Sequence, residues 1–178
     1  RADGNSIEDC NPQTATRAKE NRRSMPQIVN VIELPLPVAD VFAFFLRPAN
    51  VLALSPPELH LELVDGPDLL AQGKRVTWKG RRWGIAYRIV TEVTTLETDA
   101  LIVEEQRQGP LRKWSLTRRF EAIPQGTRLT EEIAFEPPGG LLGLTVTASA
   151  IEQDLETAFA HRARKLPELL GFTQARSD

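Results

Sequence analysis

An apolar stripe near the C-terminal end of the chain places the strongest constraint on its fold. Between about Leu141 and Leu170, apolar residues recur at steps of three and four, as they do along one face of an α-helix. The stripe consists of Leu144, Ala148, Ile151, Leu155, Phe159, Leu166 and Leu169. A helix of this length must cover its stripe, and a curved sheet is the available surface. We therefore predict a sheet wrapped around a long C-terminal helix.

The residues before this helix supply the sheet. Alternation of apolar and polar side chains predicts strands at Gln27–Leu34, Leu59–Leu63, Arg75–Lys79, Trp83–Val93, Leu101–Gln108, Lys113–Ile123 and Arg128–Phe135. Two short helices follow the first strand, around Val41–Leu46 and Ala49–Leu54, and a tight connection is expected at Gly80-Arg81. The later strands have no helices between them, which predicts an antiparallel meander. The expected fold class is α+β, with about six to seven strands.

The patterned sequence forms one domain, from residue 25 to residue 172. The leader, residues 1–24, is polar and aperiodic and carries little to bury, and residues 173–178 form a polar tail. We interpret the leader as a flexible extension or an artificial addition, with Met25 as a natural start. An N-terminal arm that docks on a partner is the alternative.

Composition excludes several classes of function. Lys and Arg number 22 against 24 Asp and Glu, and no basic block stands out, so we expect no nucleic-acid partner. No apolar run approaches the ~18 residues of a membrane span, so we expect no integral membrane association. Cys10 is the only cysteine, which fits a reducing cytoplasm. His60 and His161 lack partners at ligand spacing, and no cofactor fingerprint is present, so no metal site and no cofactor are predicted.

Several short motifs are similar to those of one superfamily. They are Pro37–Phe45 followed by Pro48-Ala49-Asn50, Glu104-Glu105-Gln106, Gly109-Pro110, Trp114 with Phe120, and Pro138–Gly143. Together with the order of elements, they resemble the SRPBCC or START-like superfamily, which includes polyketide cyclases and the birch pollen allergen. Within it, a bacterial ligand-binding subgroup is the nearest match. The resemblance covers about Pro26 to Gly171.

This resemblance implies the helix-grip fold and a cavity between sheet and helix, and it implies little about chemistry, because one fold serves many functions. The subgroup carries two histidines on the strand that reads Trp-x-His-x-His-x-Phe. Here Leu116 and Arg118 take their places. Chemistry that requires those histidines is therefore not expected.

The period of two assigns faces to the charged residues of three strands. Trp114, Leu116, Arg118 and Phe120 share an inward face, and Glu131 points inward on the next strand. The same counting places Glu105 inward on the preceding strand. Glu105, Arg118 and Glu131 then form either a polar spot that holds a ligand's head group or a structural ion pair, which is the commoner arrangement. The sharper hypothesis is that Arg118 contributes more to ligand binding than to folding.

The predicted ligand-binding residues are Trp78, Trp83, Tyr87, Glu105, Trp114, Leu116, Arg118, Phe120, Glu131, Ile151, Leu155 and Phe159. The favoured function is binding of a hydrophobic small molecule or lipid without catalysis, since apolar walls and a polar group suffice for it. The alternative is an enzyme of the cyclase or dehydratase type, with Glu105, Glu131 or Tyr87 as acid or base. An interaction domain that docks on a partner protein also stays open. We expect Ile151, Leu155 and Phe159 to pack against Trp83, Tyr87 or Trp114.

Overall fold

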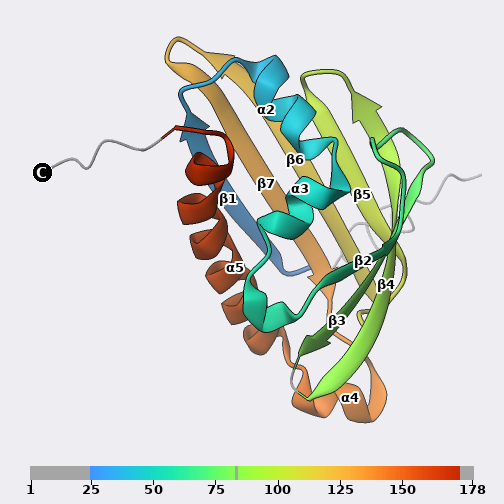
Figure 1. The fold of residues 1–178 in the computed structure, drawn as a ribbon. Coiled ribbons are helices and arrows are strands. Elements are labelled where there is room, and N and C mark those ends of the chain that lie inside the picture. Colours follow the sequence, from blue (N-terminus) through green and yellow to red (C-terminus); the bar gives the residue numbers. More distant parts are fainter. Residues whose placement is uncertain (1–24, 83, 173–178) are drawn as a thin grey trace, which may run out of the picture.

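A single curved antiparallel sheet dominates the computed structural model, which describes residues 25–82 and 84–172 (Figure 1). The sheet has seven strands in the order β1-β7-β6-β5-β4-β3-β2. The strands are β1 Gln27–Leu34, β2 Glu62–Asp65, β3 Arg75–Arg82, β4 Ile85–Glu97, β5 Leu101–Gln108, β6 Lys113–Ile123 and β7 Gly126–Glu136. The helices are α2 Val38–Phe45, α3 Pro48–Ala53, the 3₁₀-helix η1 Pro57–Leu59, α4 Gly140–Thr145 and α5 Ala148–Leu169. The predicted α+β helix-grip fold is confirmed.

The strand register decides which charged residues meet. β6 and β7 pair along their whole length, and Arg118 lies directly opposite Glu131. β5 pairs with β6 so that Glu104 lies opposite Leu116. Directly opposed residues point to the same side of a sheet. Glu104, Arg118 and Glu131 therefore all lie on the inner face.

The core has two parts on this inner face. Under α2, Phe42 and Phe45 pack on Phe120, with ring centroids 5.2 and 5.9 Å apart. Under α5, Ile151 and Phe159 are buried with residues of β6 and β7, and Trp114 and Leu155 pack against the same cluster. Burial of side chains of this size contributes about 1.5–3 kcal/mol each. The predicted packing of α5 against Trp114 is thus observed.

The predicted C-terminal helix is divided into two. Val146 and Thr147 have non-helical backbone angles, and the Thr147 hydroxyl accepts a hydrogen bond from the Ala150 amide at 3.2 Å, which begins α5 there. The chain therefore turns between α4 and α5. Leu144, on α4, is 77% exposed and does not belong to the stripe. At the other end Leu169, in the last position of α5, is also exposed.

The predicted connection at Gly80-Arg81 is wrong, because β3 continues to Arg82. Gly80 faces Tyr87 across the β3–β4 pair, and a Cβ at Gly80 would lie 2.5 Å from the Tyr87 ring. The glycine is thus needed for the close approach of a ring and not for a turn. Leu59 was likewise assigned to a strand, but it lies in η1, and β2 begins only at Glu62.

Candidate functional site

A cavity of about 270 Å³ lies between the inner face of the sheet and α5. Its walls are mainly apolar and come from β3, β4, β6 and α5, with Trp78, Ile89, Leu116, Leu155 and Phe159 among them. This volume is close to the lower end of the range of about 300–1,000 Å³ found for ligand pockets, which suits a small ligand.

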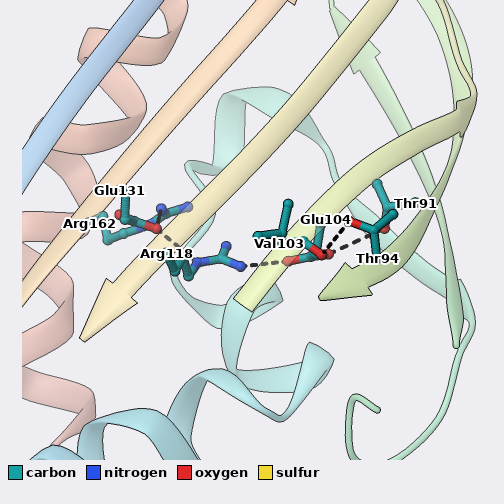
Figure 2. Close-up of polar contacts among 7 residues, drawn as sticks. All are labelled: Thr91, Thr94, Val103, Glu104, Arg118, Glu131 and Arg162. Atoms are coloured by element: carbon teal, nitrogen blue, oxygen red, sulfur yellow. Dashed lines mark hydrogen bonds and ion pairs between the residues drawn. The ribbon is translucent and has the colours of Figure 1, made fainter. Parts of the chain in front are cut away.

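A chain of charged side chains lies at one side of this cavity (Figure 2). Nη1 of Arg118 donates to Oε1 of Glu104 at 2.5 Å, and Nε of Arg118 donates to Oε1 of Glu131 at 3.0 Å. Arg162 of α5 donates from Nη1 to the same Glu131 oxygen. The order is therefore Glu104, Arg118, Glu131, Arg162, and we call these four residues the charge chain.

The charge chain is held by its surroundings as well as by its own bonds. Oε2 of Glu104 accepts a hydrogen bond from the Thr91 hydroxyl at 3.4 Å. The Arg118 guanidinium lies over the Phe45 ring at 5.2 Å, and that of Arg162 lies over Phe159 at 5.9 Å. Arginine over an aromatic face gains about 0.5–2 kcal/mol. These contacts fix the positions of both arginines relative to the cavity.

Burial makes the pairing within the chain necessary. Arg118 is 1% exposed and Glu131 is 0% exposed. Burial by itself raises the pKa of Glu131, but the charges and hydrogen bonds of Arg162 and Arg118 outweigh it and hold this pKa below its ordinary value. Burial lowers the pKa of Arg118, and Glu104 with Glu131 raises it overall. Arg118 and Glu131 therefore both stay charged at neutral pH.

A second ion pair lies at the end of the cavity near the β3–β4 turn. Arg82 and Ile85 line the cavity and are partly exposed, and we call this end of the cavity the mouth. Arg82 donates to Asp154 of α5 through Nε at 2.9 Å and through Nη2 at 2.5 Å. Nearby, burial raises the pKa of Tyr87, and Asp154 raises it further. The Tyr87 hydroxyl is therefore a neutral donor at physiological pH.

The structure brings most of the predicted site residues to the cavity. Those that line it are Trp78, Tyr87, Trp114, Leu116, Arg118, Leu155 and Phe159. Phe120, Glu131 and Ile151 are buried and do not line it. Trp83 lies outside the described residues. The two positions where the related subgroup carries histidines, Leu116 and Arg118, are both in the lining.

The prediction for Glu105 is wrong. Its side chain is 44% exposed and pairs with Arg107 at 2.9 Å on the outer face. Glu104 takes the inward position instead and bonds to Arg118. The run of Leu101, Ile102 and Val103 gives no alternation from which to count, so the face assignment slipped by one residue.

Arg162 falls within the apolar stripe of the C-terminal helix, where an arginine is expected either to reach past the end of the sheet, the commoner case, or to close the cavity with a counter-charge. The second alternative is the observed one, since Arg162 lines the cavity and pairs with Glu131. Its side chain is only 11% exposed, because Glu131 is within reach on β7. An arginine at a core-facing position of the helix signals in the sequence that a buried partner is present. The partner could be identified only by finding a carboxylate on the facing sheet.

Within residues 25–82 and 84–172, no group of three or more His, Cys, Asp or Glu side chains could hold a metal ion. None of the helices in that part of the chain is long and apolar enough to span a membrane.

Comparison with known protein families shows to which family the chain belongs. Residues 25–167 match the profile of the family described as polyketide cyclase / dehydrase and lipid transport. The chain belongs to this family. The matched range includes all seven strands and the cavity-lining part of α5. No curated protein matches the sequence.

Several solved structures share the fold at low sequence identity. A protein from Arthrobacter aurescens is 17% identical with a TM-score of 0.62, and covers 85% of this chain and 93% of its own. Ara h 8.0201 is 14% identical with a TM-score of 0.59, over 83% and 98%. Major latex-like protein 151 from Panax ginseng is 16% identical with a TM-score of 0.56, over 80% and 99%. The predicted SRPBCC membership is confirmed.

The lowered pKa of Glu131 predicts acid sensitivity. In the unfolded chain Glu131 takes up a proton near its ordinary pKa of 4.5, whereas the folded protein takes it up only at lower pH. The stabilisation is therefore complete above pH 4.5 and is lost as the pH falls through the folded value. Urea unfolding at a series of pH values should show this fall. It should be shallower in Glu131→Gln and unchanged in Glu132→Gln, whose side chain lies on the opposite face.

Equal acid sensitivity in the wild type and in Glu131→Gln would contradict this assignment. The acid transition would then belong to other carboxylates, among them Glu92, whose pKa is lowered mainly by its hydrogen bonds to Arg75 and Arg107.

Proposed function

We propose that this member of the polyketide cyclase / dehydrase and lipid transport family binds a small apolar molecule in the cavity and does not transform it. The observation that carries the proposal is the cavity of about 270 Å³, walled by apolar side chains with charged groups at one side and at the mouth. Sites of this composition hold ligands by burial and orient them by a few polar groups. The family description, which names lipid transport, is consistent with it.

We also propose a reducing, cytoplasmic setting, because Cys10 is the only cysteine.

The three residues considered as catalytic acids or bases are poorly suited to that role, which supports binding without catalysis. An acid or base must reach the reacting atoms, and its pKa should lie near the working pH. Glu105 is on the outer face, and Glu131 is enclosed behind the lining. Tyr87 does line the cavity, but burial raises its pKa further from neutrality. Of the three groups considered for an enzyme, none combines access with a suitable pKa.

A cavity-filling substitution tests the proposal. Ala158 of α5 lines the cavity, so Ala158→Trp should take up the volume that a ligand needs. We expect affinity for whichever of 1-octanol, octanoate and octylamine binds the wild type to fall by about tenfold or more, which corresponds to about 1.4 kcal/mol. Isothermal titration calorimetry measures this directly. The free energy of unfolding should change by no more than about 2 kcal/mol.

The matched control is Ala160→Trp, which places the same side chain on the exposed face of α5. It should leave the affinity unchanged. If neither variant alters binding, the ligand binds elsewhere and the proposal fails. Native mass spectrometry of protein purified from its own host would identify a retained ligand by mass.

A further inference from the structure

Among the described residues, the charged side chains that line the cavity and those that form ion pairs with them carry a total charge of zero, and this has a consequence for the ligand. Four charged side chains line the cavity: Arg82, Glu104, Arg118 and Arg162. Counted alone, three arginines against one glutamate would favour an anionic ligand. However, Glu131 lies behind the lining and pairs with both Arg118 and Arg162, and Asp154 pairs with Arg82.

With these two carboxylates included, each charge has a counter-charge. The charge chain contains two arginines and two glutamates, and the mouth pair contains Arg82 and Asp154. An ion that enters this cavity would add one unpaired charge to a desolvated, balanced cluster. Burial of an unpaired charge is far more costly than burial of a hydroxyl or carbonyl group with a partner.

The uncharged polar groups of the lining complement a neutral ligand. Ser55, Tyr87 and Thr91 line the cavity. The hydroxyls of Ser55 and Thr91 already donate, to the Val51 carbonyl at 3.1 Å and to Glu104 at 3.4 Å, and can accept a hydrogen bond, whereas the Tyr87 hydroxyl can donate one. Gln106 is less suitable, because its Nε2 donates to the Leu111 carbonyl at 2.7 Å and its Oε1 lies close to Gly109. Neutral donors and acceptors are thus available along an otherwise apolar wall.

We infer that the cavity selects an uncharged apolar ligand that carries a hydroxyl or carbonyl group, and rejects carboxylates and amines of the same size. The inference rests on the proposed function and adds the chemical class of its ligand. It differs from the anionic ligand that the lining arginines alone would favour, since these arginines are already paired with Glu104, Glu131 and Asp154.

Three probes with the same alkyl chain test the inference on the intact protein. We expect calorimetric titration at pH 7 to show 1-octanol binding about tenfold or more tightly than octanoate or octylamine. Between pH 7 and about pH 5, octanoate should gain affinity as it becomes neutral, while 1-octanol should not change. This pH comparison needs no variant and so does not depend on whether a variant folds.

Two charge variants should change the order of preference. Glu104→Gln leaves the charge chain with a net charge of +1, and the ratio of octanoate to 1-octanol affinity should rise by about tenfold. Arg162→Met leaves a net charge of −1 and should favour octylamine instead. The matched control is Glu105→Gln, one residue along the same strand but on the outer face, which should leave every ratio unchanged.

The outcomes distinguish this inference from the proposed function. If octanoate or octylamine binds the wild type as tightly as 1-octanol, or if Glu104→Gln folds and leaves the ratio unchanged, the inference is overturned and binding in the cavity still stands. If none of the three probes binds, the proposed function fails and the inference fails with it.

Discussion

Replacing Arg118 by methionine should lower the free energy of unfolding by about 3–5 kcal/mol, the usual effect of breaking a buried ion pair. Arg118 is 1% exposed and bonds to both Glu104 and Glu131. Methionine keeps most of the apolar stem but loses the guanidinium that lies over the Phe45 ring. The two carboxylates would lose the cation between them, and the pKa of at least one should rise.

The matched control is Arg119→Met, the next residue on β6, which points to the exposed outer face. Its effect on the free energy of unfolding should stay within about 0.5 kcal/mol. Urea melts of both variants, with 1-octanol titrated into each, separate the two roles considered for Arg118. A stable Arg118→Met protein with lost binding would show that the arginine contacts the ligand and is not primarily structural.

The fold could be predicted from the sequence because two independent patterns agreed. The helical period after residue 140 and the period of two in β6 and β7 both pointed to buried faces, and these faces pack on each other. The bounds of β1 and β6 follow from their alternation and flanking turns, and those of β5 follow from its flanking turns. The division of the last helix at Thr147 could not be read in this way, because Leu144 continues the apolar period although it faces solvent.

The candidate site was less predictable, and the reason lies in β5. Its apolar residues are consecutive and so are its two glutamates, so either face assignment satisfies the pattern. The register with β6 resolves it, since Glu104 lies opposite the buried Leu116. Register depends on long-range pairing and is not encoded by the strand alone.

Arg162 shows a second limit of reasoning from one element at a time. On α5 alone, an arginine within an apolar stripe suggests a side chain that extends to water. Its partner Glu131 is on another element, and on β7 alone that residue looks like an isolated buried acid. Each residue explains the other only once helix and sheet are packed together. The neutrality of the charge chain, and with it the expected ligand class, depends on that contact.

The second large effect on stability is expected from Gly126→Ala. Gly126 begins β7 with φ +142, and a Cβ there would lie 2.1 Å from the Leu34 carbonyl oxygen and 2.8 Å from the Leu36 nitrogen. These are backbone atoms of the connection between β1 and α2, so they cannot move aside as a side chain could. The neighbouring Thr127 hydroxyl donates to the Leu36 carbonyl at 2.7 Å and is fully buried in this contact.

Backbone strain costs about 1–3 kcal/mol, and forced displacement of packed groups costs a similar amount. We therefore expect Gly126→Ala to lower the free energy of unfolding by about 3 kcal/mol or more in urea melts. Gly73→Ala is the matched control, because Gly73 also has positive φ, +80, but a Cβ there meets nothing within 4 Å. It should show the strain without the clash, about 1–2 kcal/mol. Equal losses in the two variants would mean that φ alone requires glycine at position 126. A larger loss for Gly126 would show that the β6–β7 hairpin and the β1–α2 connection are held at a separation that admits no side chain.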